Sequence, residues 1–236
     1  MQRIMGYMRK AIQEYGMIEP GDRIAVGISG GKDSIALAAG LAGLQKFIGI
    51  PFQLVGVTLD PGWNGQRTDY GPIGQMCESM GMAYHVLETE IGPIVFEARE
   101  ESNPCSLCAR MRRGALHDAA KQFGCNKIAL GHHYDDAVET FVMNLFHEGR
   151  VGCFSPVTYL SRKDLTMIRP LIFAPEREIA SAVRKAGYPI IKSQCPVDGS
   201  TQREWTKNWL RQMEKEQKGI TKRLFGAMKR GHISDW

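Results

Sequence analysis

The sequence contains no long hydrophobic run, and this absence limits where the chain is expected to work. No stretch approaches the roughly 18 apolar residues of a membrane-spanning helix, and the first residues lack the apolar core and small-residue cleavage site of a secretory signal. The sequence also has no internal repeat, no low-complexity tract and no clear linker. These absences predict a cytoplasmic protein without membrane contact, folded as one domain or as one domain with a small appendage.

Paired cysteine motifs are also scarce, because the six cysteines include a single Cys-x-x-Cys. A cytoplasmic chain is not expected to carry a disulfide framework, so the spacing of its cysteines is examined for metal binding or catalysis. Three stand apart among apolar or small neighbours and are expected to be buried without a chemical role: Cys77, Cys125 and Cys153. The others, Cys105, Cys108 and Cys195, are the candidates for chemistry.

The positive charge of the chain is concentrated near its C-terminus. The whole chain carries a formal net charge of +5, which favours an anionic partner. Between residues 203 and 230, nine Lys or Arg stand against three Glu, a net charge of +6. This stretch is expected to be helical and contains Trp205 and Trp209. Basic and aromatic residues together favour RNA binding, although two Trp at i, i+4 equally fit the core stripe of a solvated helix.

Strand and helix patterns alternate along the chain, whose composition, 43% hydrophobic and 23% charged, is ordinary for a globular protein. Alternation of this kind predicts an α/β fold, a doubly wound, Rossmann-like parallel sheet with helices on both faces and ligands outside the carboxyl ends of the strands. The expected strands are residues 23–28, 52–59, 83–88, 127–130 and 165–170, and the expected helices are residues 1–17, 33–48, 68–81, 104–123, a helix opening near 134, and 175–187. We expect residues 1–199 to form this domain and residues 200–236 to form a basic helical segment packed on it.

The strongest local signal is the hexapeptide Ser29-Gly30-Gly31-Lys32-Asp33-Ser34, between the first strand and the following helix. Two glycines let the backbone approach a ligand closely, and the unpaired N–H groups of the first helical turn favour an anion. Lys32 adds a mobile positive charge, and the two serines add hydroxyl donors. The hexapeptide therefore predicts a phosphate-binding loop.

The two best-known nucleotide motifs do not match this loop. A Walker A loop requires Gly five residues before its Gly-Lys pair and Ser or Thr directly after it, but Val26 and Asp33 occupy these places. The dinucleotide-binding pattern requires a second Gly two residues after the first, and Gly27 is followed there by Ser29. The loop therefore belongs to another class of phosphate-binding turn.

Polar residues follow two of the other expected strands at their carboxyl ends. Leu59 and Asp60 end the second strand, where Asp60 equally fits a plain strand-to-turn position. The segment Gly131-His132-His133-Tyr134-Asp135-Asp136 follows the fourth strand and opens a helix. The fold places this segment on the same edge as the phosphate loop. Alternatively, its two aspartates only complement the positive end of the helix.

Cys105 and Cys108 lie at the start of the expected helix 104–123. Asn103 is the expected N-cap, and Pro104 suits the first helical position. At spacing i, i+3 both sulfurs project from one face of the helix, where its N-terminus favours the thiolate form. This arrangement is typical of a metal site.

The phosphate loop is similar to the Ser-Gly-Gly-x-Asp-Ser signature of the PP-loop ATP pyrophosphatases, which cleave ATP between its α and β phosphates. Three further features complete a more specific pattern: Cys105-x-x-Cys108 followed by Ala-Arg-Met-Arg-Arg-Gly, the segment 131–140, and the isolated Cys195. Together with the C-terminal segment 222–236 they resemble the tRNA 2-thiocytidine synthase family, PP-loop enzymes that sulfurate a base. The resemblance runs from about residue 20 to the end of the chain.

This resemblance implies an ATP-dependent sulfurtransferase. The C2 carbonyl oxygen of a tRNA base, expected to be cytidine, is adenylated and then replaced by sulfur delivered at a 4Fe-4S cluster. The cluster is implied to be held by Cys105, Cys108 and Cys195, and three thiolates leave one iron open for an exogenous sulfide. The implied partners are tRNA and a sulfur donor, either sulfide or a cysteine desulfurase, and a homodimer is expected from the resemblance alone.

The motif positions also imply roles for individual residues. Catalytic roles are expected for Lys32, Asp135, Asp136 and the three cysteines of the cluster. Residues expected to contact ATP are Ser29, Gly30, Gly31, Lys32, Asp33, Ser34, Leu59, Asp60, Gly131 and His132. Magnesium is expected on Asp33 and Asp136. Arg112, one turn after Cys108, is expected to contact the nucleotide or RNA, or else to form an exposed salt bridge.

Other functions remain open from the sequence. A different PP-loop ATP pyrophosphatase, of the lysidine synthase or amidotransferase-ligase type, explains the loop but leaves the three cysteines idle, unless they form a zinc site completed by His132, His133 or another cysteine. The cysteines alternatively carry persulfides, and the sulfur acceptor is alternatively a small molecule. A third class is a non-catalytic, metal-stabilised RNA-binding module.

Overall fold

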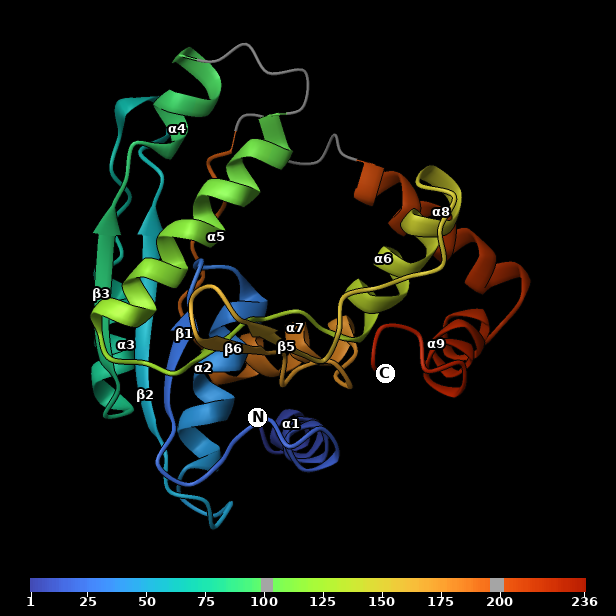
Figure 1. Cartoon of the computed structure of the whole chain (residues 1–236), viewed down its shortest axis with the longest axis horizontal. Helices are drawn as coiled ribbons and strands as arrows, with labels where there is room; N and C mark the ends of the chain where they lie inside the picture. The colour runs from blue at the N-terminus through green and yellow to red at the C-terminus, as the bar shows by residue number, and fades with distance from the viewer. Residues whose placement is uncertain (99–103, 196–201) are drawn as a thin grey trace.

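The computed structural model describes residues 1–98, 104–195 and 202–236 (Figure 1). Asn103, the expected N-cap, and residues 199–201, where we expected the boundary between two segments, lie outside the described residues. Within the described ranges, no helix combines the length and apolar character that crossing a membrane requires.

Six strands form one sheet in the order β3-β2-β1-β4-β6-β5. Their bounds are β1 (Arg23–Gly27), β2 (Gln53–Asp60), β3 (Ala83–Glu88), β4 (Lys127–Ala129), β5 (Val157–Leu160) and β6 (Leu165–Ile168). In this order, β3, β2, β1, β4 and β6 run parallel to one another. The strand order reverses between β1 and β4, and such a switch point is where an open α/β sheet binds its ligands. The sheet confirms the predicted α/β fold.

The edge strand β5 corrects the prediction of an entirely parallel sheet. It pairs with β6 in antiparallel register, from Val157 opposite Ile168 to Leu160 opposite Leu165. This strand has little local signal, because it is short and only half-buried, and the connecting turn contains neither Gly nor Asn. Instead, Asp164 adopts the left-handed conformation there, with φ of 47°.

Helices cover both faces of the sheet. α5 (Pro104–Gln122) packs on one face of β1, β2 and β4, and Ala25 of β1 belongs to the apolar core beneath it. α2 (Lys32–Leu44) packs on the other face together with α1 (Gln2–Glu14) and α7 (Glu176–Ala186), where Ile24 and Val26 join the larger core. The other helical elements are α3 (Gly71–Ser79), α4 (Ile91–Pro93), α6 (Tyr134–His147), η1 (Trp63–Gly65) and η2 (Ile94–Ala98).

The C-terminal residues form two helices instead of the one charged helix expected from residue 201. α8 (Gln202–Glu216) and α9 (Ile220–Arg230) both pack on α6, as Figure 1 shows. The chain turns between them at Gly219, whose φ is 84°. The Glu214 carboxylate stabilises this turn, because it accepts hydrogen bonds from the backbone N–H groups of Gly219 and Thr221 at 2.6 and 3.1 Å. The basic segment therefore lies against the helix that follows β4.

Candidate active site

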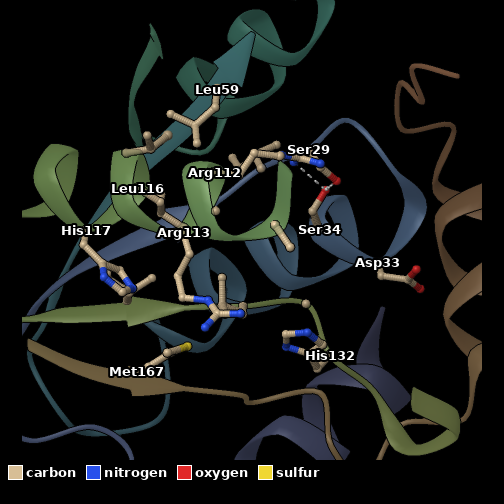
Figure 2. A pocket seen from close by; sticks show the side chains of 17 residues that line it. Ser29, Asp33, Ser34, Leu59, Arg112, Arg113, Leu116, His117, His132 and Met167 are labelled. Carbon is tan, nitrogen blue, oxygen red and sulfur yellow. Dashed lines mark hydrogen bonds between the residues drawn. The ribbon is translucent and has the colours of Figure 1, made fainter. Parts of the chain in front are cut away.

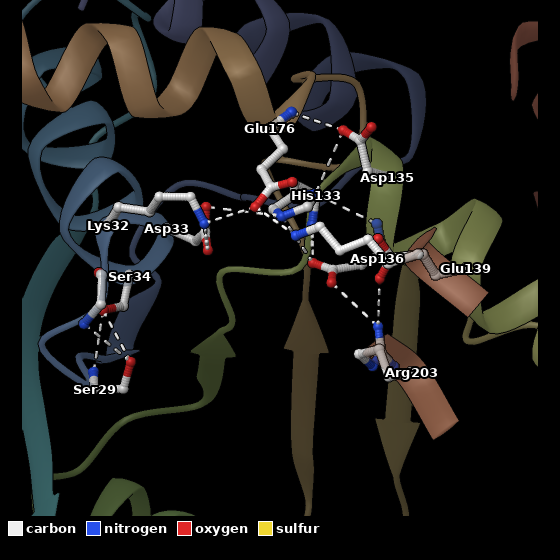
Figure 3. Close-up of polar contacts among 12 residues, drawn as sticks. Ser29, Lys32, Asp33, Ser34, His133, Asp135, Asp136, Glu139, Glu176 and Arg203 are labelled. Atoms are coloured by element: carbon white, nitrogen blue, oxygen red, sulfur yellow. Dashed lines mark hydrogen bonds and ion pairs between the residues drawn. The ribbon is translucent and has the colours of Figure 1, made fainter. Parts of the chain in front are cut away.

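The loop between β1 and α2 is closed by hydrogen bonds between its own residues (Figure 3). The Ser34 hydroxyl donates to the carbonyl oxygen of Gly31 at 2.9 Å and accepts from the backbone N–H of Ser29 at 3.1 Å. The Ser29 hydroxyl also lies 3.2 Å from that of Ser34. Ser34 is buried and therefore maintains the shape of the loop, while the N-terminus of α2 is available to an anion.

A cavity of about 390 Å³ adjoins this loop at the switch point between β1 and β4 (Figure 2). Ser29, Asp33 and Ser34 form its polar end. Apolar side chains of the sheet and α5 form much of the remaining wall: Ile28, Val57, Leu59, Leu116, Ile128 and Leu130. A polar end for phosphates and an apolar wall for a flat ring are what an adenine nucleotide requires.

The two residues predicted at the end of β2 are placed differently. Leu59 lines the cavity, in agreement with its expected place near the adenine and ribose. Asp60 is buried, and its carboxylate accepts hydrogen bonds from the backbone N–H groups of Gly62 and Thr68, both at 3.1 Å. Asp60 therefore stabilises the turn after β2, and its contact with the nucleotide stays a prediction.

Gly131 and His132 line the cavity from the end of β4. A Cβ added to Gly131 would lie 3.1 Å from the backbone nitrogen of Ser34, so only glycine allows this approach to α2. Burial, reinforced by the positive charge of Arg169, lowers the pKa of His132 to about 4. Its Nδ1 is buried and has no hydrogen-bond partner among the described residues. The imidazole is thus neutral at neutral pH and offers one N–H donor and one acceptor.

His133 and Asp136 cap the start of α6 reciprocally. The Asp136 carboxylate accepts from the backbone N–H of His133 at 2.9 Å, and the backbone N–H of Asp136 donates to Nδ1 of His133 at 3.3 Å. Nε2 of His133 lies 3.4 Å from a carboxylate oxygen of Asp136 and 3.7 Å from Oδ1 of Asp33. The two predicted magnesium ligands therefore flank one imidazole ring.

Asp33 has an unsatisfied oxygen that suits a hard cation. Its Oδ1 is buried and has no hydrogen-bond partner within the described ranges. Carboxylate oxygens are magnesium ligands, and magnesium commonly takes one or two of them together with phosphate oxygens and water. The described residues contain no group of three or more His, Cys, Asp or Glu that could hold a metal ion. The donor set therefore fits magnesium bound with a phosphate ligand.

Lys32 is held between two carboxylates (Figure 3). Its Nζ lies 3.0 Å from Asp33 and 3.0 Å from Glu176, the first residue of α7. Burial disfavours the ammonium form, but these two carboxylates outweigh burial and raise the pKa of Lys32. Glu176 also lies 2.8 Å from Nζ of Lys207 in α8, and its backbone N–H donates to Asp135 at 2.7 Å. Burial opposes ionisation of Glu176, but the two lysines lower its pKa to about 2.

A second set of ion pairs, which no sequence motif predicts, joins α8 to α6. The Arg203 guanidinium lies 3.2 Å from Asp136 and 3.3 Å from Glu139, and it donates to the Thr140 hydroxyl at 3.2 Å. Glu139 is only 4% exposed. Burial, reinforced by the negative charge of Asp136, raises the pKa of Glu139 to about 7. Neither Glu176 nor Arg203 has a local signal, because each meets its partner only through helix packing.

Replacing Glu139 by glutamine is expected to flatten the pH dependence of stability. Folding raises the pKa of Glu139 from 4.5 to about 7, so the folded chain binds more protons than the unfolded chain between these values. Its contribution to stability is therefore present below pH 4.5 and is lost as the pH rises through about 7, by roughly 3 kcal/mol at most.

Thermal unfolding at about pH 5 and about pH 8 measures this difference. Glu139→Gln should gain Tm over the wild type mainly at the higher pH, whereas Glu148→Gln, at the exposed C-cap of the same helix, should show no such difference. An equal Tm shift of Glu139→Gln at both pH values would contradict the assignment.

Cys108 and Cys195 line a second cavity, of about 230 Å³. Cys108 lies in α5 and Cys195 in the segment after α7, while Cys105, one turn before Cys108, is exposed. All three are free thiols. Burial raises the pKa of Cys108, Arg112 opposes this rise, and the nearby Cys195 and Cys105 add to it. The structure therefore brings Cys108 and Cys195 to one cavity, whereas within its described residues no three His, Cys, Asp or Glu are grouped as metal ligands, so the three-cysteine site stays a prediction.

A backbone hydrogen bond ties the Cys195 segment to the phosphate loop. The N–H of Ile191 donates to the carbonyl oxygen of Gly30 at 3.0 Å. Gly30 has φ of 86°, and a Cβ added to it would lie 3.0 Å from Cβ of Ile191, so both the backbone conformation and this contact require glycine. The phosphate loop and the segment that carries Cys195 are therefore in direct contact.

The two cavities adjoin each other. Ser29, Leu59 and Arg112 line both of them. Arg112 therefore lies between the nucleotide cavity and the thiols, the position that its predicted contact with nucleotide or RNA requires. Residues of the phosphate loop therefore line one cavity, and two of the predicted thiols line its neighbour.

Other residues singled out from the sequence lie away from this junction. Cys77 and Cys125 are buried and Cys153 is partly buried, and burial raises the pKa of all three, to about 11 for Cys77 and to about 12 for Cys153. Trp209 packs against the core, with its ring 5.0 Å from that of Phe146. Trp205 is 51% exposed, so the two Trp divide between the core and the surface.

The chain is similar to known proteins over most of its length. The family model described as "PP-loop domain" matches residues 4–215. Similar curated proteins include the tRNA-cytidine(32) 2-sulfurtransferase of Geobacter sulfurreducens, 39% identical over 96% of this chain and 89% of that protein. The same enzyme of Pelobacter propionicus is 39% identical over 98% of this chain and 86% of that protein.

A solved structure is also similar. The U34-tRNA thiolase NcsA from Methanococcus maripaludis, with its 4Fe-4S cluster, aligns with a TM-score of 0.81 and 26% identity. The alignment covers 97% of this chain and 77% of that chain. The family match extends into α8, so it includes part of the basic segment as well as the sheet.

Proposed function

This chain belongs to the PP-loop domain family, and we propose that it is an ATP-dependent tRNA sulfurtransferase that forms AMP and pyrophosphate. The modified base is proposed to be a cytidine, because the tRNA-cytidine(32) 2-sulfurtransferases match nearly the whole chain. The wall that the nucleotide cavity shares with the thiol cavity, formed by Ser29, Leu59 and Arg112, carries the proposal. A base at this junction faces the α-phosphate on one side and the thiols on the other.

The first step of the proposed reaction is adenylation. The C2 carbonyl oxygen of the base attacks the α-phosphorus of ATP, and pyrophosphate leaves. Negative charge is redistributed over the phosphate oxygens, so a fixed positive charge and N–H donors at the loop lower the barrier. We assign Lys32 to charge neutralisation, the loop amides of Gly30 and Gly31 to the phosphates, and the Ser29 hydroxyl to a phosphate hydrogen bond.

Asp33 and Asp136 are the carboxylates proposed to hold magnesium, for which the unpartnered Oδ1 of Asp33 is the supporting observation. Magnesium at this position offsets charge at the α and β phosphates. Asp135 or Asp136 is proposed to polarise the base. Because Asp136 also caps α6 and pairs with Arg203, its replacement affects the helix as well as the chemistry.

Cys105, Cys108 and Cys195 are the residues proposed to hold a 4Fe-4S cluster. Two of these soft thiols, Cys108 and Cys195, line one cavity, and Cys105 lies one helical turn before Cys108. Three thiolates suit such a cluster, in which each would bind a different iron, whereas a structural zinc ion needs four ligands on one centre. When bound, the cluster leaves one iron without a protein ligand and supplies the place where the incoming sulfur is held. Leu59 and Trp63 line this cavity and limit the access of water to the activated base.

The remaining partners belong to the same proposal. The substrate is tRNA, and the sulfur comes from sulfide or from a cysteine desulfurase. We propose that the chain acts in the cytoplasm as a homodimer. The basic residues of α8 and α9 favour an anionic substrate such as RNA.

Nucleoside mass spectrometry tests the proposed function. Unmodified tRNA is incubated with the anaerobically purified protein, ATP, magnesium and sulfide, and its nucleosides are then analysed. We expect 2-thiocytidine, with AMP and pyrophosphate formed in equal amounts. An analogue of ATP that cannot be cleaved between its α and β phosphates should give no thiolated nucleoside. Pyrophosphate release without sulfur in the RNA would contradict the proposal and indicate another acceptor.

A further inference from the structure

A basic groove extends away from the phosphate loop, and Lys32 and Asp135, to which chemical roles are assigned above, belong to its lining. Its volume is about 1080 Å³, and α1, α7, α8 and α9 contribute most of its lining. Six exposed cations line it: Arg3, Lys10, Arg177, Arg211, Lys222 and Arg230. An ion pair between Lys229 and Glu14 joins α1 to α9.

The carboxylates of this groove are used by contacts within the protein. Glu176 pairs with Lys32 and Lys207, and Glu178 lies 2.8 Å from Nε of Arg3. The other two are occupied by hydrogen bonds to backbone N–H groups, since Asp135 accepts from Glu176 and Glu214 accepts from Gly219 and Thr221. The negative charges are therefore largely neutralised or fixed inside the structure.

Most of the exposed cations have no such partner. Within the described residues, no carboxylate lies at ion-pair distance from Arg177, Arg211, Lys222 or Arg230. Their charges come from three different helices and face one groove. The groove therefore presents a surplus of positive charge to an external anion.

Packed aromatic rings line part of the groove. Tyr134 and Phe225 lie with their ring centroids 4.4 Å apart, and Phe173 lies 6.1 Å from Phe225. Nζ of Lys10 lies 5.0 Å from the centroid of Phe173. Because these rings are packed against one another, the helices that carry the cations are held at fixed positions around the groove.

On α9, a glycine separates two of these cations. Lys222, Gly226 and Arg230 follow at intervals of four residues and therefore share one face of the helix. A Cβ added to Gly226 would lie 2.9 Å from a guanidinium nitrogen of Arg230, so the bare glycine lets this guanidinium fold back over the helix. A glycine inside a helix costs about 1 kcal/mol relative to alanine.

We propose that the groove binds the phosphodiester backbone of the tRNA substrate. The inference rests on the proposed function and adds α1 and α7 to the RNA surface that the sequence placed in the C-terminal helices. Cations spread over four helices match a chain of regularly spaced phosphates, whereas one pyrophosphate ion occupies only a small part of such a groove. Phosphate contacts of this kind position the RNA, and the junction at Arg112 selects the base.

The test compares two double variants that remove the same charge. Lys222→Gln with Arg230→Gln changes the groove face of α9, and Lys218→Gln with Arg223→Gln changes exposed cations that do not line the groove. Binding of an unmodified tRNA transcript is measured by fluorescence anisotropy over a range of KCl concentrations. The groove variant should bind about tenfold more weakly, and its slope of log K against log salt should fall by about two, since two phosphate contacts are lost. The control variant should keep the wild-type slope.

A third variant leaves the net charge unchanged. Gly226→Ala should displace the Arg230 guanidinium and weaken tRNA binding by about two- to threefold, while the thermal stability rises because alanine favours the helix.

Titration of the wild type and of the groove variant with inorganic pyrophosphate shows whether the groove binds RNA phosphates or a free phosphate ion. Loss of pyrophosphate binding with unchanged tRNA binding would overturn the proposal.

The outcomes distinguish this inference from the proposed function. Equal weakening of tRNA binding in both double variants would overturn the groove and leave the function intact. No tRNA binding by the wild type would overturn the proposed function and the groove with it.

Discussion

Replacing Lys32 by alanine is expected to lower kcat/KM for thiolation by about 10²- to 10³-fold, the usual effect of removing one charge-stabilising group from a transition state. Lys32 is the ammonium of the phosphate loop, and its raised pKa keeps it charged throughout the neutral range. The loss should appear mainly in kcat, because the charge on the phosphates is redistributed as pyrophosphate departs. Quantification of pyrophosphate in single-turnover reactions measures the adenylation step directly.

Lys207→Ala is the matched control for Lys32. Both ammonium groups lie within 3.0 Å of the same carboxylate of Glu176, but only Lys32 belongs to the loop. Lys207→Ala should therefore change kcat by about threefold or less, as expected for the loss of one partly exposed ion pair. Comparable losses in the two variants would show that the ion-pair network, and not the loop ammonium, carries the effect.

Replacing Cys108 by alanine is expected to abolish thiolation and to lower the iron and sulfide content far below the about four of each per chain that a complete cubane carries. Cys108 is partly buried, as is Cys195, and these two line the thiol cavity together. Nucleotide binding should change by less than about twofold, because Cys108 does not line the nucleotide cavity. Iron and sulfide analysis, the visible absorption spectrum and ATP binding are measured on the same anaerobic preparation.

Cys125→Ala provides the control for removal of a thiol. Cys125 is buried below α5 and lies outside both cavities, so its replacement should leave iron content and thiolation unchanged even where it lowers the Tm. Cys105→Ala and Cys195→Ala should behave like Cys108→Ala. Full activity in all three ligand variants, or a colourless protein with one zinc ion per chain, would contradict the cluster and favour another PP-loop reaction.

Several elements could be predicted from the sequence because their signals are local. The strand predicted at residues 83–88 is confirmed by β3 at the same residues. The loop of residues 29–34 lies between β1 and α2, as expected from its glycines and the apolar segments on either side. Helix ends were less accurate. The helix expected to reach residue 48 ends at Leu44. The apolar residues after Leu44 fit the hydrophobic pattern of a helix, but they lie in a turn.

Other elements had no local signal. β5 is held in the sheet by its antiparallel pairing with β6 and has little apolar pattern of its own. Gly219 breaks the basic segment into two helices, although a single glycine within a helical pattern does not require a break. The Glu214 carboxylate that stabilises the turn is recognisable only once α8 and α9 are both in place.

The sequence by itself determined the reaction class and the groups that support it. Phosphate binding depends on a contiguous motif, in which a few residues at fixed spacing place N–H groups and a lysine on one turn. Two of the three proposed cluster ligands, Cys105 and Cys108, likewise lie one turn apart, and the third, Cys195, was named only through the family resemblance. Because parallel strands place their carboxyl ends at one edge of a sheet, the predicted fold also brought these motifs to the same edge. The tertiary structure alone decided how they are joined: the hydrogen bond from Ile191 to Gly30, the contact of Glu176 with Lys32, and the groove between α1, α7, α8 and α9. These contacts link residues far apart in the chain, and they depend on helix packing, which no local pattern specifies.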